Sequence, residues 1–452
     1  MKKIFCFLIA GLFFAVPVLA FEPPTPLYET LPNGLKIVLL EDHELPTFEL
    51  VLYLKSGSLY DSPKKSGIAA LTGTVLRTGG TLQRTPEMLD QEFDNAAVSF
   101  SVSTKREVQV LTIHCLREDA YWVLDRLFEI LTTPRFDEER FLLAQSQLLE
   151  EIRRQNEDRL NRGGREFQKL IYGSKSRWAS FPTEKSVKKI KRKELVSFWQ
   201  NYFVPNGAVI GVSGDFIGSE MLKTLQEKTT GWKSHPVKFP KILPIPETFE
   251  ERNVLIPDAV SQTTLFVGHL GGERSNPDKY ALTVMNYILG GIGSMTSRLG
   301  EEIRSREGKA YSVWSEFGFG EDRGVFSAGA QTKAENSSFV VEKIQEIIRQ
   351  MSGGINLTEE EVAKAKKGIV TALVFEYENR FNIVDNETYF QFLGYPQEYL
   401  KRYQEGIEKV SLEEVRRVAG QYLHPEGLKI LMIAPEETIL PSGRRFEKKE
   451  SL

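Results

Sequence analysis

The chain is poor in cysteine and histidine, and its charges nearly cancel. Its 452 residues include two cysteines and five histidines, and the formal net charge is −3 at pH 7. Cys6 lies in the apolar N-terminal run, which leaves Cys115 as the one thiol beyond it. An internal disulfide is then excluded, so a large apolar core has to hold the protein together. The near-neutral charge argues against nucleic acid as a partner.

The N-terminus has the pattern of a secretory signal peptide. Lys2 and Lys3 precede an apolar run from Ile4 to Val18, and Ala20 follows shortly after. This order predicts a signal peptide over residues 1–20 and export, and the short basic start favours the bacterial periplasm. An uncleaved anchor is the alternative, although the run is shorter than the ~20 residues that a spanning helix needs. Because the later sequence has no comparable apolar run, we expect no stable membrane insertion.

Two segments of the sequence repeat each other at a constant offset of 220 residues. The segment 190–212 matches the segment 410–432, with a tyrosine, a proline and a glycine in register. Each segment has the apolar spacing of a helix, followed by a Pro-x-Gly turn and an apolar strand. The repeat predicts two homologous α+β domains.

A proline-rich stretch separates the two repeats. Four prolines lie within residues 235–246, and they disfavour both a helix and a central strand. We therefore expect an extended linker over 235–248. The resulting organisation is an N-terminal domain over 21–234, a C-terminal domain over 249–440 and a tail over 441–452.

Each half of the sequence begins with strands and continues with long helices. Strands are predicted over 35–40, 48–54 and 98–116, the last with a turn near Lys105 and Arg106, and helices over 118–132, 138–153, 279–289, 338–351 and 359–377. Strands followed by runs of helices are typical of an antiparallel-rich sheet with helices packed on one face. The predicted fold class is α+β.

One motif region is similar to that of a known family. Residues 57–63 read Gly-Ser-Leu-Tyr-Asp-Ser-Pro, and residues 67–74 read Gly-Ile-Ala-Ala-Leu-Thr-Gly-Thr. They resemble the pitrilysin/insulinase zinc peptidases, the inverzincins, in which G-S-x-x-E/D-x-P precedes G-L-A-H-x-x-E-H. In that motif two histidines bind zinc and the glutamate activates the attacking water.

The residues that carry zinc chemistry in that family are missing from this sequence. The histidine positions correspond to Ala70 and Thr74, and the glutamate position corresponds to Gly73. Alanine has no donor atom, threonine is a poor zinc ligand, and glycine is not a base. We therefore expect no metal and no catalytic residue in this chain, which should not cut peptides alone.

Other candidate ligands are weak. No two histidines have the spacing of a shared helical face, and His114 in an alternating apolar segment is interpreted as a packed core residue. Glu150 and Glu151 occupy the place from which the family's third ligand comes. We interpret them as exposed helix residues beside two arginines, Arg153 and Arg154. An active zinc peptidase with unrecognised ligands is a third alternative.

A second block in the C-terminal half resembles the same family closely. Residues 286–291, 297–299 and 303–313 match n-x-i-L-G-G, s-R-L and l-R-x-x-x-G-x-A-Y-s-v. The resemblance implies that Arg304 and Tyr311 face a zinc site and hold substrate carbonyl groups and the developing oxyanion. A guanidinium and a phenol have the donors for this role. In the alternative interpretation, Arg304 caps its own helix and Tyr311 packs on a sheet edge.

The resemblance covers the chain from about Leu31 to Pro435 and implies a clam-shell of two domains around a chamber. It implies an exported pseudo-peptidase subunit, similar to the non-catalytic subunits of mitochondrial processing peptidase and of bacterial two-subunit members. A homologous partner would bring H-x-x-E-H and zinc, and the substrate would be an unfolded or short peptide that adds a strand to a sheet edge. The alternative is a non-catalytic peptide-binding or scaffold protein of the same fold.

Overall fold

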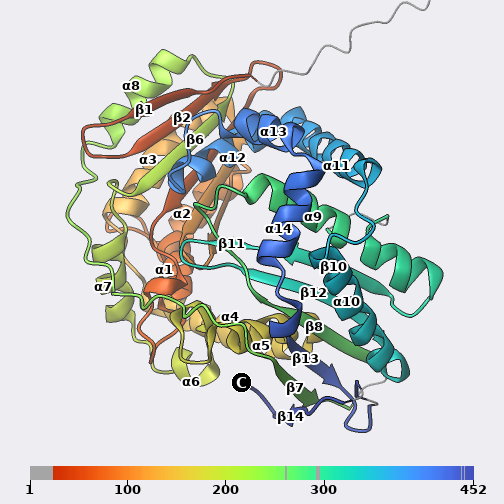
Figure 1. Cartoon of the computed structure of the whole chain (residues 1–452). Coiled ribbons are helices and arrows are strands. Elements are labelled where there is room, and N and C mark those ends of the chain that lie inside the picture. Colours follow the sequence, from red (N-terminus) through yellow and green to blue (C-terminus); the bar gives the residue numbers. More distant parts are fainter. Residues whose placement is uncertain (1–23, 260–261, 292–295, 439, 442) are drawn as a thin grey trace, which may run out of the picture.

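The computed structural model describes residues 24–259, 262–291, 296–438, 440–441 and 443–452, so the expected signal peptide lies outside the described residues. The first half forms a six-stranded sheet in the order β1-β2-β6-β3-β5-β4 (Figure 1). Its strands are β1 (Leu27–Thr30), β2 (Lys36–Glu41), β3 (Thr47–Leu54), β4 (Ser99–Thr104), β5 (Gln109–Leu116) and β6 (Ala208–Gly214).

The second half forms another six-stranded sheet, in the order β10-β12-β8-β13-β7-β14. Its strands are β7 (Arg252–Pro257), β8 (Gln262–Leu270), β10 (Ser312–Phe317), β12 (Val325–Lys333), β13 (Lys429–Ala434) and β14 (Glu447–Lys448). In each sheet a parallel pair, β2 with β6 and β7 with β13, continues into a run of antiparallel strands. The sixth strand differs, since β1 is antiparallel to β2 whereas β14 is parallel to β7. The arrangement shared by the other strands confirms the predicted pair of homologous α+β domains.

Long helices cover the sheets. They are α1 (Ile68–Thr78), α2 (Pro86–Asn95), α3 (Ala120–Thr132), α4 (Glu138–Glu157), α5 (Arg159–Tyr172), α6 (Glu184–Val187), α7 (Arg192–Tyr202), α8 (Gly218–Lys228), α9 (Lys279–Leu289), α10 (Ser337–Ser352), α11 (Glu359–Glu378), α12 (Arg380–Phe392), α13 (Tyr399–Lys409) and α14 (Leu412–Tyr422). The helices predicted from periodicity are confirmed as α3, α4, α9, α10 and α11. None of the described helices is long and apolar enough to cross a membrane.

The two halves exchange one helix each. Helix α5 of the first half packs on β8 and β13, and α12 of the second half packs on β2, β3 and β6 (Figure 1). Phe167 of α5 stacks on Phe266 of β8 with ring centroids 5.5 Å apart. Tyr53 of β3 lies 5.5 Å from Tyr389 of α12 and donates a 2.7 Å hydrogen bond to Asp385. Helices of the same half cover one face of each sheet, as predicted, and the exchanged helix covers the other.

The side chains of β3 show how both faces are buried. Leu50 and Leu52 point into the main first-half core, whereas Val51 and Tyr53 belong to a cluster with residues of α12. On the neighbouring strand, His114 lies on the α12 side. Its ring is 4.9 Å from that of Phe381 in an edge-on contact, and its side chain is 42% exposed. The prediction of a packed core histidine is therefore wrong, because the α12 side of β5 is only partly covered.

Gly211 of β6 makes the close approach of α12 possible. A Cβ atom there would meet the Thr388 hydroxyl and lie 2.7 Å from Val384 Cγ1. We expect Gly211→Ala to lower the free energy of unfolding by about 1–3 kcal/mol, because α12 has to move away from the sheet. Urea unfolding measures the change. Gly164→Ala in α5, with nothing within 4 Å of its Cβ, is the control and should not destabilise the protein. Equal stability of both variants would contradict close packing at Gly211.

Candidate functional site

The turn before α1 fixes the start of this helix, which contains the altered motif positions Ala70, Gly73 and Thr74. The Asp61 carboxylate is 4% exposed and accepts the backbone N–H groups of Gly67 at 2.6 Å and Ala69 at 2.8 Å. These groups belong to the first turn of α1, where N–H donors lack partners within the helix. Arg177 donates to the carbonyl oxygens of Leu59 and Asp61 from the other side. The G-S-x-x-D-x-P turn therefore caps and orients α1.

The space for a catalytic glutamate on α1 is filled by another side chain. A Cβ atom on Gly73 would lie 2.5 Å from Gln109 Oε1 and 2.9 Å from Val102 Cγ1. Gln109 is fully buried, and its Nε2 donates to the Ala69 carbonyl at 2.6 Å. Its Oε1, which faces Gly73, has no hydrogen-bond partner among the described residues. The helix keeps its place in the fold, but a larger residue at position 73 requires Gln109 and Val102 to move.

The other motif positions do not fit a zinc ion either. Ala70 lines the cavity described below, and Thr74 is half-buried on the same helix. Among the residues that the structure describes, no group of His, Cys, Asp and Glu side chains could hold a metal. The residues at the family's zinc site therefore do not suit the ion.

Glu150 and Glu151 are paired within their own helix. The carboxylate of Glu150 lies 3.4 Å from Arg153, and that of Glu151 lies 2.7 Å from Arg154. Gln155 also donates to Glu151 at 2.8 Å. These contacts agree with the interpretation of two helix glutamates in local ion pairs.

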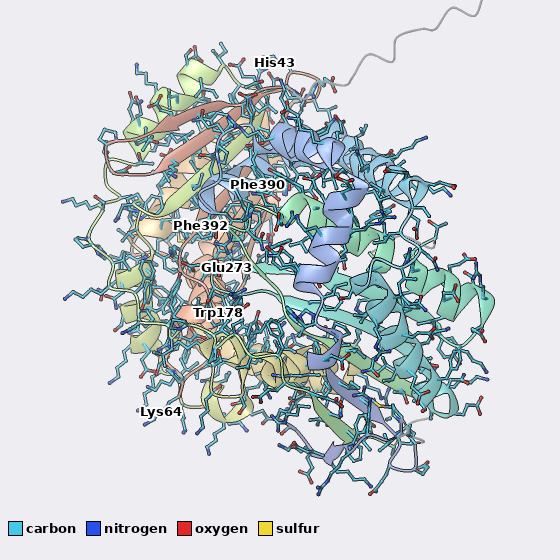
Figure 2. All side chains as sticks on the ribbon, viewed as in Figure 1. His43, Lys64, Trp178, Glu273, Phe390 and Phe392 are labelled. Atoms are coloured by element: carbon cyan, nitrogen blue, oxygen red, sulfur yellow. The ribbon has the colours of Figure 1, made fainter. Side chains whose placement is uncertain are left out.

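A cavity of about 640 Å³ lies where the two halves face each other. Ala70 of α1 is on its first-half wall, and Trp314 of β10 is on its second-half wall. Trp178, which also lines the cavity, is labelled in Figure 2 near the centre of the molecule. The walls are rich in aromatic side chains, namely Phe167, Tyr172, Trp178, Phe181, Phe266, Trp314 and Phe319. We call this cavity the chamber.

Polar contacts between the halves hold the chamber together. Arg274 of the second half donates to both carboxylate oxygens of Glu107, at 2.6 and 2.8 Å. Tyr172 donates from α5 to the Arg323 carbonyl at 2.9 Å. Tyr395 in turn donates to the carbonyl of Arg274 at 3.0 Å. Arg274 makes both contacts through one nitrogen, Nη2, and this ion pair together with the Tyr172 hydrogen bond links the two halves at the chamber.

Arg304 and Tyr311 lie away from Ala70. Arg304 is exposed on the π-helical segment Gly300–Arg306 and has no ion pair among the described residues, whereas the nearby Arg306 binds Glu301 and Glu302. Tyr311 is 54% exposed and lines a different hollow, at the end of β10. The two predicted substrate-binding residues therefore do not face this chain's own degenerate motif.

Sequence reasoning missed the residue that packs against Gly73 and residues that shape the chamber. Gln109 begins an apolar strand, and Arg106 appears in the sequence only as part of a turn. Trp178 lies in the short 3-10 segment Arg177–Ala179, which has no periodicity to detect. These residues meet only through the packing of distant segments.

The duplicated fold and the altered motif together define a two-domain, peptidase-like protein that lacks the zinc-binding motif of active zinc peptidases. A family model described as Insulinase (Peptidase family M16) matches residues 36–164, and one described as Peptidase M16 inactive domain matches residues 189–369. The chain belongs to peptidase family M16.

The similar proteins include one that is named a non-peptidase and several that are named uncharacterized zinc proteases. The "Non-peptidase homolog YmxG" of Helicobacter pylori is 24% identical over 430 residues, which is 92% of this chain and 94% of that protein. The "Probable mitochondrial-processing peptidase subunit beta" of Arabidopsis thaliana is 22% identical over 435 residues, 93% of this chain and 80% of that protein. A solved structure titled as a peptidase M16 inactive domain from Pseudomonas fluorescens has a TM-score of 0.84 at 23% identity, covers 92% of this chain and all of that one, and confirms the fold.

The contact between Gly73 and Gln109 predicts strong coupling between the two positions. Gly73→Ala should lower the free energy of unfolding by about 1–3 kcal/mol, because the added methyl overlaps the buried amide. In a Gln109→Ala background the same change should cost clearly less, because only the 2.9 Å contact with Val102 Cγ1 remains. Urea unfolding of the four proteins gives the coupling energy, and additive effects would show that the amide does not block position 73.

Asp61 predicts a specific dependence of stability on pH. Burial raises the pKa of its carboxyl to about 7, although the two amide hydrogen bonds act in the opposite direction. The pKa of an aspartate in the unfolded chain is about 3.9, so the folded state favours the protonated carboxyl. Its contribution to the free energy of unfolding is therefore largest below about pH 4 and is lost as the pH rises through about 7. The unfolding free energy of the wild type minus that of Asp61→Asn should therefore fall between pH 4.5 and pH 8. Parallel curves for the two proteins would refute the raised pKa.

Proposed function

We propose that this chain is an exported pseudo-peptidase subunit that pairs with a zinc-bearing homologue. The homologue supplies H-x-x-E-H and zinc, and this chain supplies Arg304 and Tyr311 to bind the peptide substrate and its developing oxyanion. Export to the periplasm rests on the signal-peptide pattern of residues 1–20.

The exposure of Arg304 and Tyr311 is the main observation in favour of a site that is shared with another subunit. The Arg304 guanidinium has no ion pair within the described part of the chain, and the Tyr311 phenol is 54% exposed, so both can meet groups of another chain. Both residues belong to the block that resembles the family's substrate-binding residues. Their position outside the chamber of this chain favours a site that another subunit completes.

The relatives support a subunit without its own catalysis. One similar protein is named a non-peptidase homolog, and another is named a subunit of a processing peptidase. Gly73 provides no catalytic carboxylate, and a glutamate there would require Gln109 and Val102 to move. A partner is therefore required for any peptide hydrolysis that involves this chain.

The edge strands favour an extended peptide as the bound molecule. β4 is the outer strand of the first sheet and β10 is the outer strand of the second. Thr104 at the end of β4, and Trp314 and Glu316 of β10, line the chamber. An extended peptide can add to such an edge through main-chain hydrogen bonds.

The test is a mixing experiment with the mature chain and an H-x-x-E-H homologue encoded beside it. A quenched peptide should be cleaved by the pair and not by this chain alone. Arg304→Ala should lower kcat of the pair by about 100-fold, as expected for loss of an oxyanion donor, and Tyr311→Phe should also lower it.

Arg306→Ala is the matched control, since this arginine is two residues away and is bound to glutamates of its own segment. It should change the rate by less than about twofold. Full activity of the pair with Arg304→Ala would reject the proposed role of this arginine.

A second candidate function is a peptide-binding or scaffold protein without catalysis. The observation that favours it is the chamber itself, which keeps its aromatic walls although no metal group exists among the described residues. An obligate partner that also lacks H-x-x-E-H would support this alternative.

A further inference from the structure

Arg106 places a guanidinium on the wall of the chamber. The residue lies in the turn between β4 and β5, and its side chain lines the cavity. Nη1 donates to the Ser180 carbonyl at 2.6 Å, and Nη2 donates to Gln168 Oε1 at 3.2 Å. The ring of Phe181 covers the group, with its centroid 4.7 Å from the guanidinium carbon. Two neutral oxygens and one aromatic ring therefore hold the arginine in place.

This guanidinium has no ion-pair partner, unlike the other arginines of the interface. Among the described residues, no carboxylate lies within 4.0 Å of Arg106. By contrast, Arg274 binds Glu107, and Arg323 binds Glu247 at 2.8 Å. A desolvated charge without a counter-ion is costly for a folded protein. Burial lowers the pKa of Arg106, but an arginine side chain stays protonated, so the charge persists.

The acidic groups around the chamber are engaged or lie elsewhere on its walls. Asp61 is an acidic group whose charge acts on Arg106, and its carboxylate already accepts two backbone N–H groups. Both oxygens of Glu107 are held by Arg274. Glu316 belongs to the opposite, second-half wall on β10. The N–H groups of Arg106 that are not used by Ser180 and Gln168 are left for a ligand.

We propose that Arg106 is a carboxylate-binding subsite that selects acidic peptides in the chamber. Its remaining N–H donors bind a carboxylate, either the C-terminal one or that of an Asp or Glu side chain. Trp178 and Phe181 provide apolar contact for the neighbouring peptide atoms. This inference rests on the proposed binding of peptides by the chamber, and it adds the charge of the peptide that is preferred.

The test uses the mature chain and three dansyl-labelled octapeptides of one neutral sequence. One has a free C-terminal carboxylate, one has a C-terminal amide, and one has the amide and a central glutamate. Fluorescence anisotropy gives each Kd. At least one carboxylate-bearing peptide should bind about tenfold or more tightly than the neutral amide, as expected for a hydrogen-bonded charge. The stronger of the two identifies the carboxylate that Arg106 prefers.

Variants assign the preference to one residue. Arg106→Gln should bring all three Kd values within about twofold of one another, and Arg106→Lys should keep only part of the preference. Lys175→Gln removes the same charge from an exposed residue that does not line the chamber and should leave the preference intact. Circular dichroism checks that each variant is folded. If a variant does not fold, the comparison of the three peptides on the unaltered chain still tests the subsite.

Each outcome has a separate meaning. If the neutral amide binds as tightly as both acidic peptides, the subsite is refuted while peptide binding by the chamber stands. If the acidic preference persists in Arg106→Gln, another residue is responsible and the assignment fails. If no peptide binds at all, the proposed peptide-binding chamber fails, and the subsite fails with it.

Discussion

The exchange of α5 and α12 between the two halves is the constraint on which the rest of the structure depends. Each sheet has one face covered by a helix from the opposite half, with Phe167 stacked on Phe266 and Tyr53 packed against Tyr389. Burial of one large apolar side chain contributes about 1.5–3 kcal/mol, so separation of the halves would expose a substantial part of the core. The chamber therefore lies between two halves that are joined by buried helix–sheet contacts.

The packing between the halves helps to explain how the peptidase fold is stable without the residues of the zinc motif. The motif helix is held by the Asp61 cap and by the fold around it, not by metal coordination. Gln109 has taken the space beside Gly73, and its amide bonds to the backbone of the same helix. The residues at the motif positions are therefore part of the packing of the domain.

Much of the fold follows from local patterns, and most of the site does not. The apolar stretch over 48–54 and the helical periodicity over 279–289 predict β3 and α9 closely, because burial leaves a local pattern of apolar residues in the sequence. The placement of α12 on the first sheet has no such signal. The local pattern therefore predicts a core position for His114, although its side chain is half-exposed beside Phe381 of α12. The pairing of Gln109 with Gly73 joins different elements, so no local pattern shows it.

The measurement that tests the account most directly is native mass spectrometry of the complex purified from its own host through a tag on this chain. The account predicts one copy of this chain, one homologous chain with H-x-x-E-H and a single zinc ion that remains with the homologue when the two are separated. Stoichiometric zinc on this chain alone would contradict the account, because the packing at Ala70, Gly73 and Thr74 would then have to accommodate a metal.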